Sequence, residues 1–533
     1  MNRLILSLLF SAATTSFAMS SPVNQLPTAC KYNGAFSAKT YDSTSGVCRT
    51  IKYATAGGEV QLLVCDKGDH YELYRQSAPA SGTLKACTGA GCVDQLAGFA
   101  SFTGTSLPAD MVQTTTPPPL VDPNSTGFAG QTRAQNHATL VDAWWNNTAV
   151  VQTLTCPTGS CAWVPWYTSS TSCSTLHDCN IPGGPTATQN CMVTDEFSQV
   201  FLVTAQGENE SRVQQLVRML DAIDNTASGL PAWKVKRNGN TLDFSQSDNG
   251  NSASDADARI LIALYTAANS SYFSASAKVD FRTRADALAA NFLANDFRNE
   301  PRGGITYWLA GGANQKSGGL NSSGFTYAGY YGDAVLALLA AYRSTGNTNY
   351  RTAAQDTVSA YLLAANFNGS SFSVPPIKFH WDTSYTPPHP VCEDYCADWG
   401  YDDAPRATSM CKAKYAASLA GVTLPSALDA YCQSWMNSGG ITSTEFKPKY
   451  TLGGTPLDGF QTGAWENGLA AALNFVNNTG DLPTRLNRVG QHYVGGSGIW
   501  DDPNLCYGVY RNAIFPANLG SAIGRDLAAF TAP

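Results

Sequence analysis

Apolar residues recur at helical spacing along most of this 533-residue chain, from about residue 128 to near its end. Gly, Asn and Pro separate the periodic segments, and no strand-like alternation intervenes. Helices are predicted over residues 134–145, 197–205, 213–223, 257–268, 285–297, 327–342, 350–365, 406–420, 427–435, 463–476 and 514–530. About a dozen helices in roughly 400 residues predict a mainly α domain of packed helical hairpins, such as a double-ring helical barrel.

The first part of the chain follows a different pattern. Residues 59–65 and 71–74 alternate between apolar and polar side chains and are bounded by Gly, Ser and Asp, which is typical of short strands. We expect residues 19–110 to form a small β module stapled by disulfides. Its cysteines are Cys30, Cys48, Cys65, Cys87 and Cys92. A Thr/Pro-rich linker, residues 111–127, is predicted to separate this module from the helical domain, residues 128–533.

Residues 1–18 have the features of a signal peptide, with a basic start, an apolar core at 4–10 and small residues that end at Ala18. We therefore expect a secreted, extracellular protein. Its 15 cysteines then predict a disulfide framework, and the odd number leaves one thiol free or bonded to another molecule. No later apolar run is long enough to span a bilayer, so no membrane partner is expected.

The low charge content argues against several functions. Only 14% of residues are charged, the net charge is −7, and no Lys/Arg cluster could neutralise phosphates, so a nucleic-acid partner is not expected. The chain has no phosphate-binding loop, dinucleotide fingerprint, serine-hydrolase elbow or zinc-protease motif. His380, His389, Cys392 and Cys396 lie near one another but match no zinc spacing, so we expect no metal and no cofactor. We also expect a monomer.

Acidic side chains gather just before three of the predicted helices. These residues are Asp195 and Glu196, Asp255 and Asp257, and Asp402 and Asp403. One interpretation is helix capping by Ser254 or Asp255 together with a favourable interaction between acids and the helix dipole. The other is a cleft, because helices that run in the same direction in a barrel would bring all three clusters to one end.

The segment Ala253-Ser-Asp255-Ala-Asp257, followed by apolar residues at helical spacing through Ala267, resembles the signature of glycoside hydrolase family 8. Residues 193–207 are similar to the family's segment around its general acid, and residues 401–406 to the segment around its general base. The blocks occur in the family's order and cover roughly residues 130–530. This resemblance implies an (α/α)6 barrel and an inverting endo-glycanase.

The resemblance also implies residue roles. Glu196 corresponds to the general acid, and Asp403 to the general base, with the adjacent Asp402 as the alternative base. An inverting enzyme needs these two carboxyls roughly 6.5–9.5 Å apart, so that a water fits between the base and the sugar. Glu196 must remain protonated although a helix N-terminus lowers a carboxyl pKa, so burial and a neighbour such as Asp195 or Phe197 must outweigh the dipole.

Other predicted site residues bind the sugar or hold the acidic side chains in position. The resemblance implies that Asp255 holds the distorted sugar at the cleavage point, and Asp257 is expected to support it. Arg406 is expected to pair with Asp403 or Asp402. Aromatic side chains that could stack on sugar rings are Trp399, Tyr327, Trp166 and Trp381.

The expected function is cleavage of a β-1,4-linked polysaccharide, with cellulose or a β-glucan as the first choice. A chitosanase or a xylanase of the same family is the alternative substrate class. A secreted carbohydrate-binding protein without catalysis and a lyase on a similar barrel are the alternative functions, although the acidic clusters argue against a lyase. The N-terminal module is interpreted either as a carbohydrate-binding module or as a stabilising cap.

Overall fold

A computed structural model describes two parts of the chain. In the N-terminal part it describes the strands within residues 17–102, and in the rest it describes residues 121–148, 150–166, 190–224, 228–244, 251–316, 320, 324–394, 403–438, 450–455 and 508–531. The chain divides into two compact units, residues 1–117 with 533, and residues 118–532. The predicted linker, residues 111–127, therefore overlaps the second unit, where the Val121 amide donates to the Ala522 carbonyl (3.0 Å).

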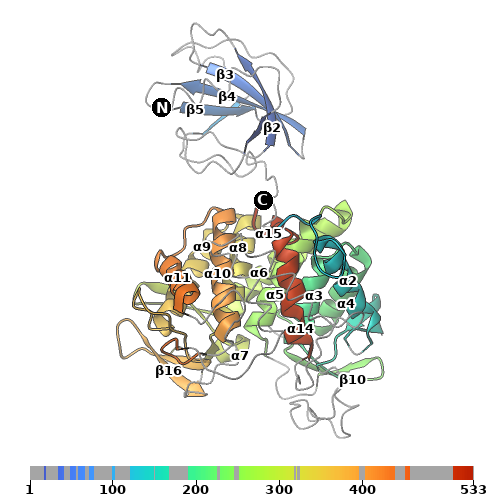
Figure 1. Ribbon diagram of the computed structural model, residues 1–533, viewed down its shortest axis with the longest axis vertical. Coiled ribbons are helices and arrows are strands. Elements are labelled where there is room, and N and C mark those ends of the chain that lie inside the picture. Colours follow the sequence, from blue (N-terminus) through green and yellow to red (C-terminus); the bar gives the residue numbers. More distant parts are fainter. Residues whose placement is uncertain are drawn as a thin grey trace. The chain divides into compact units, whose positions relative to one another are not determined.

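The first unit contains one six-stranded antiparallel sheet in which each strand pairs with the next along the chain (Figure 1). Its strands are β1 (Phe17–Met19), β2 (Gly34–Thr40), β3 (Cys48–Thr55), β4 (Gly58–Asp66), β5 (Tyr71–Gln76) and β6 (Phe99–Phe102). The two alternating segments identified in the sequence are β4 and β5. Cys48 and Cys65 lie in β3 and β4, but the side chains of this module are outside the described structure, so its disulfides stay a prediction.

The second unit is built from helical hairpins (Figure 1). Its helices are α2 (Arg133–Asn146), α3 (Thr194–Ala205), α4 (Glu210–Ile223), α5 (Ser254–Ala268), α6 (Ala275–Asn295), α7 (Ala313–Lys316), α8 (Tyr330–Thr345), α9 (Thr348–Ala364), α10 (Asp403–Ala420), α11 (Ala427–Ser438), α14 (Gly508–Ala522) and α15 (Ala528–Thr531). The predicted helix at 463–476 lies outside the described residues, and the one predicted at 514–530 is divided between α14 and α15.

Helices α3, α5, α8, α10 and α14 form an inner layer, in which α14 packs on α3, α3 on α5, α5 on α8, and α8 on α10. Every residue of α5 is buried, including its polar residues Ser254, Asp255, Asp257 and Arg259. Close approach requires small residues: a Cβ added at Gly332 of α8 would collide with Ser409 of α10, and one at Gly520 of α14 would collide with Gln206 beside α3. The inner helices therefore pack as one continuous layer.

Buried polar side chains join the last inner helix to the first. Gln206 follows α3, and its Nε2 donates to the Ala517 carbonyl of α14 (2.9 Å) and to Asp526 Oδ2 (3.1 Å). Lys412 of α10 donates to Ser521 Oγ (2.6 Å) and forms an ion pair with the fully buried Asp526 (3.3 Å). This network connects α3, α10 and α14 at the end of the unit where α3 terminates.

The prediction that no strands intervene between the helices is wrong. Short strands connect them: β7 (Gln152–Cys156), β8 (Gly159–Trp163), β9 (Cys191–Val193), β10 (Lys234–Asn238), β11 (Thr241–Asp243), β12 (Phe297–Arg302), β13 (Ile305–Leu309), β14 (Thr326–Tyr327), β15 (Lys378–Asp382) and β16 (His389–Asp394). The β12–β13 turn uses Gly303 and Gly304, both at positive φ (56° and 86°), a conformation that glycine adopts without strain. Such short hairpins bury too few alternating residues to give a clear strand pattern.

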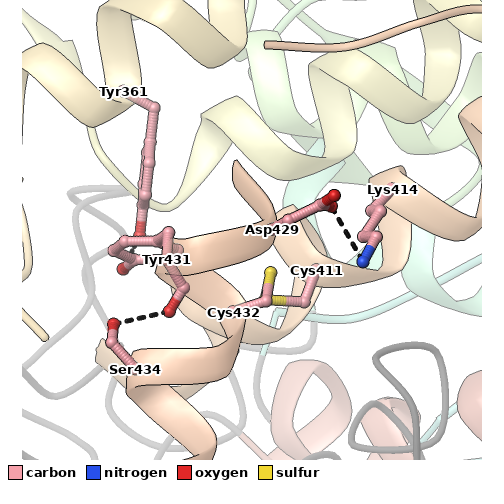
Figure 2. Close-up of a disulfide and its surroundings, with 7 residues drawn as sticks. All are labelled: Tyr361, Cys411, Lys414, Asp429, Tyr431, Cys432 and Ser434. Carbon is pink, nitrogen blue, oxygen red and sulfur yellow. Dashed lines mark hydrogen bonds and ion pairs between the residues drawn. A yellow bond between two sulfur atoms is a disulfide. The ribbon is translucent and has the colours of Figure 1, made fainter. Parts of the chain in front are cut away.

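Two disulfides are described in full in this unit. Cys156–Cys161 closes the β7–β8 hairpin, and Cys411–Cys432 joins α10 to α11 across 21 residues. Figure 2 shows the second disulfide beside the ion pair between Lys414 and Asp429 (2.8 Å). The outer helix α11 is thus covalently tied to the inner helix α10, which begins at Asp403. Among the described residues, no helix is both long enough and apolar enough to cross a membrane.

Candidate active site

The first turns of three inner helices meet around one arginine. Arg259 of α5 donates through Nη2 to Asp255 of the same helix, through Nη1 to Asp333 of α8 (2.9 Å), and through Nε to Ser198 of α3 (3.0 Å). The side chains of Arg259 and Asp255 are only 3% exposed. Since all these residues lie near the starts of their helices, α3, α5 and α8 run in the same direction, and their N-termini meet at one end of the unit.

The acids at these helix starts do not cap the helices. Helix α5 follows Ala253 and helix α3 follows Val193, and neither N-cap position makes a side-chain hydrogen bond within the described structure. Ser254, one of the two predicted caps, instead donates to the carbonyl of Ala310 (2.7 Å). The capping interpretation is therefore wrong for these helices, and the buried carboxyl of Asp255 needs another explanation.

Trp233 connects the starts of α3 and α5. Its backbone carbonyl accepts a hydrogen bond from the amide of Thr194, the first residue of α3 (3.0 Å). Its own backbone amide donates to the backbone carbonyl of Asn251, three residues before α5 (2.9 Å). Its indole Nε1 donates to Asp195 Oδ2 (3.0 Å). Lys234, the next residue, places its ammonium 3.9 Å from the indole centre. One residue therefore positions both the backbone and a carboxyl at this end of the unit.

The two carboxyls on α3 differ in exposure. Asp195 is partly exposed, whereas Glu196 is 2% exposed. Burial, with the nearby charge of Asp255, raises the pKa of Asp195 to about 7. Burial, with the charge of Asp195, raises the pKa of Glu196 well above its usual value. These two effects exceed the opposing influence of the helix N-terminus, as the sequence predicts for Glu196.

A second acidic pair lies within electrostatic range of Asp255. Asp257 and Asp296 are both fully buried, and Ser252 donates to Asp296 Oδ1 (3.0 Å). Burial, followed by the charge of Asp296, raises the pKa of Asp257 well above its usual value, while burial raises the pKa of Asp296 to about 6. Among the charged neighbours of Asp257, Asp296 has the larger effect on its pKa and Asp255 a smaller one, and the predicted support of Asp255 by Asp257 stays a prediction.

Aromatic residues border the carboxyls. Tyr330 begins α8, and its ring lies 5.0 Å from that of Tyr327, centre to centre. Burial, followed by the charges of Asp255 and Asp195, raises the pKa of Tyr330, which therefore lies within electrostatic range of both acids. Tyr327 and Tyr330 are both partly exposed. This places the predicted sugar-binding Tyr327 next to the acidic cluster.

Two predicted stacking residues are in the core instead. Trp381 is 1% exposed and packs edge-on against Trp308 and Phe379, with ring centres 5.0 and 5.2 Å apart. Trp166 is 6% exposed. Neither indole presents a free face on which a sugar ring could stack, so these two predictions are corrected. Both tryptophans follow or lie within short strands, and the sequence does not distinguish their inward orientation from an outward one.

The predicted base lies at the start of another inner helix. Asp403 is the first residue of α10, and α10 packs against α8. The side chains of Asp403 and Arg406 are outside the described part of the chain, and so are Asp402 and Trp399 in full. Their predicted roles therefore stay predictions. Among the residues that the structure describes, no group of three or more His, Cys, Asp or Glu side chains has the geometry of a metal site.

Several residues of this site are not identified by the sequence pattern, namely Arg259, Trp233, Tyr330, Asp333 and Asp296. Arg259 follows Asp255 by four residues, a spacing that signals an ion pair on one helix face. The other four come from three parts of the chain, since Tyr330 and Asp333 lie on α8, Trp233 precedes β10 and Asp296 follows α6, and only the fold brings these parts together. The resulting site combines a partly exposed carboxyl that titrates near neutral pH, a buried carboxylate with a counter-charge, and aromatic side chains.

These features define a class: a helical-hairpin unit with a carboxyl site at the N-terminal ends of its inner helices. A β-1,3-1,4-glucanase from Paenibacillus sp. X4 has a similar fold, with a TM-score of 0.51 and 17% identity over 75% of this chain and 95% of that chain. An endo-β-1,4-glucanase from Acetobacter xylinum gives a TM-score of 0.47 and 14% identity (74% and 99% covered). A cold-adapted family 8 xylanase gives a TM-score of 0.49 and 14% identity over 77% of this chain and 98% of that chain.

The chain thus shares its fold with a β-1,3-1,4-glucanase. No family model matches the sequence. No curated protein matches it either.

Proposed function

We propose that this protein is an endo-acting glycosidase of glycoside hydrolase family 8 that cleaves a β-1,4-linked polysaccharide with inversion. One observation carries the proposal: Asp195 and Glu196 of α3 and Asp255 of α5 meet at one end of the inner helices without capping them. The fold that the chain shares with a β-1,3-1,4-glucanase supports it. Secretion, predicted from residues 1–18, agrees with a substrate too large to enter a cell.

Inverting hydrolysis assigns a task to each helix. The acidic pair on α3 supplies the proton for the leaving glycosidic oxygen, and a raised carboxyl pKa suits this task. Asp403 or Asp402, at the start of α10, activates the water on the opposite face of the sugar. Asp255, whose charge is balanced by Arg259, accepts hydrogen bonds from sugar hydroxyls at the cleavage point.

The substrate is tested with a panel of carboxymethylcellulose, lichenan, xylan and chitosan, with release of reducing ends as the readout. We expect the glucans to be cleaved first, whereas preferential cleavage of xylan or chitosan would change the substrate class and leave the reaction type intact. The variant Asp255→Asn should lose at least about a hundredfold in activity. Asp280→Asn, on the surface of α6, is the matched control and should retain wild-type turnover.

NMR of the freshly released reducing end tests the stereochemistry. A β-linked substrate should first give the α anomer, and initial release of the β anomer would contradict inversion. If the wild-type protein binds these polysaccharides and releases no reducing ends from any of them, the proposal is wrong. That result would favour the carbohydrate-binding protein without catalysis.

A further inference from the structure

Adjacent carboxyls on α3 leave open which of them transfers the proton. The family resemblance assigns this role to Glu196, but Glu196 is 2% exposed. Within the described residues no donor reaches its buried Oε2. Asp195 is partly exposed and lies in the same first turn of the helix. A group that protonates a polysaccharide must come within hydrogen-bond distance of the glycosidic oxygen, which favours the more exposed carboxyl.

Trp233 makes the two oxygens of Asp195 inequivalent. An indole N–H can only donate a hydrogen bond, so the oxygen that it contacts, Oδ2, must act as an acceptor. Because the carbonyl oxygen of a protonated carboxyl is the better acceptor, this contact favours a proton on the other oxygen, Oδ1. The backbone of Asp195 is also held, because its carbonyl accepts from Ser198 Oγ (2.8 Å), which in turn accepts from Arg259 (3.0 Å). The carboxyl is thus fixed in position and in the location of its proton.

The charged groups around Asp195 come from three helices. Glu196 adjoins it on α3, Asp255 and Arg259 face it from α5, and the Tyr330 phenol faces it from α8. Burial and the Asp255 charge bring the pKa of Asp195 to about 7, so its protonated form is well populated near neutral pH. Burial and the Asp195 charge also raise the pKa of Glu196, so a raised pKa does not distinguish the two carboxyls, whereas the greater exposure of Asp195 does.

We propose, on the basis of the function proposed above, that Asp195 rather than Glu196 is the general acid, and that Trp233 is its positioning residue. The proton moves from Asp195 Oδ1 to the glycosidic oxygen as the C1–O bond breaks, and the leaving sugar departs as an alcohol. Water attacks C1 from the opposite face, forms the new C1–O bond, and gives its proton to the base carboxylate on α10. Asp195 then regains a proton from solvent and the base carboxyl releases one to solvent, so the net reaction consumes one water and needs no other reactant.

Leaving-group dependence tests this assignment. The variants Asp195→Asn and Glu196→Gln are compared on a polysaccharide of the panel and on a dinitrophenyl β-cellobioside, whose leaving group departs without protonation. Asp195→Asn should lower kcat/KM on the polysaccharide by roughly 10²–10⁴-fold. On the aryl glycoside the factor by which kcat/KM falls should be at least ten times smaller. Glu196→Gln should affect both substrates to a similar extent. Circular dichroism confirms that each variant is folded.

Trp233→Phe provides an independent measurement. The indole hydrogen bond stabilises the carboxylate and lowers the pKa of Asp195, so its loss should raise that pKa. Because an acid must be protonated to act, the alkaline limb of kcat/KM should move upward by about one pH unit. Trp145→Phe is the matched control, since this indole donates to the neutral Thr204 of α3 (3.0 Å) and its loss should leave the pH profile unchanged.

Three results have distinct meanings. The assignment to Asp195 is wrong if Trp233→Phe leaves the alkaline limb unshifted. It is also wrong if the leaving group affects the activity loss of Glu196→Gln and not that of Asp195→Asn. Either result leaves the proposed function standing. A wild-type protein inactive on the whole panel would overturn the proposed function itself, and with it this assignment.

Discussion

Replacement of Arg259 by methionine should strongly destabilise the helical unit. Arg259 is buried and bonded to Asp255, Asp333 and Ser198, which lie on three inner helices. Methionine fills much of the same volume but cannot donate a hydrogen bond. The substitution therefore leaves the carboxyls of Asp255 and Asp333 without their shared cation in a site that is largely inaccessible to water.

Removing one partner of a buried ion pair costs about 3–5 kcal/mol, because the remaining charge stays desolvated. We expect Arg259→Met to lower the free energy of unfolding by that amount. Asp333→Asn should cost less, about 1–2 kcal/mol, because the amide oxygen still accepts from Arg259. In the double variant the loss in free energy of unfolding should be smaller than the sum of the two single losses by at least about 1 kcal/mol. The reason is that Asp333→Asn removes one of the buried charges that Arg259→Met leaves without a partner.

Urea titration followed by tryptophan fluorescence measures these differences. Arg284 offers a matched control, because it also contacts two carboxylates, Asp221 and Asp280, but on the surface, where its side chain is 33% exposed. Arg284→Met should cost no more than about 1 kcal/mol. If Arg259→Met costs no more than this control, or if the Arg259 and Asp333 variants are additive within about 0.5 kcal/mol, the interpretation of Arg259 as a buried shared cation is wrong.

Three further predictions concern other parts of the unit. Burial and the charge of Asp296 raise the pKa of Asp257, so the free energy of unfolding falls as pH rises from the usual aspartate pKa toward the raised one. The urea midpoint should therefore be lower at pH 9 than at pH 5, and Asp257→Asn should remove this difference. Replacing Cys411 and Cys432 by serine should lower the free energy of unfolding by about 3 kcal/mol, from the 21-residue separation, and an unchanged urea midpoint would contradict this. Tyr327→Ala should raise KM for the polysaccharide more than it lowers kcat, and the reverse split would argue against sugar binding there.

Much of the helical unit is predictable from periodicity. Apart from residues 463–476, which lie outside the described part of the chain, each predicted segment contains or overlaps a helix, because an apolar face at helical spacing needs a packing partner wherever it occurs. Helix starts are predicted less well, and α5 begins at Ser254 instead of residue 257. Acids in a first turn are commonly solvent-exposed, so the sequence left capping as an open alternative where the structure buries Glu196, Asp255 and Asp257.

Short hairpins and side-chain orientation are not predictable in this way. The strands β12 and β13 are too short to reveal their alternation, so the end of the predicted helix at 285–297 runs into β12. Trp381 lies in a short strand, where neighbouring positions face opposite directions. Its burial depends on Trp308 and Phe379, which come from β13 and from its own strand β15.

The sequence by itself determined the helical class of the second unit, the strands of the first, and the acidic clusters before three helices. The tertiary structure decided which acids meet and how each is solvated. Asp195 and Asp255 are 60 residues apart, and the packing of α3 against α5 gives them one electrostatic environment, with Arg259 and Trp233 between the helices. Protonation depends on burial and on nearby charges, and both arise only when distant segments pack together.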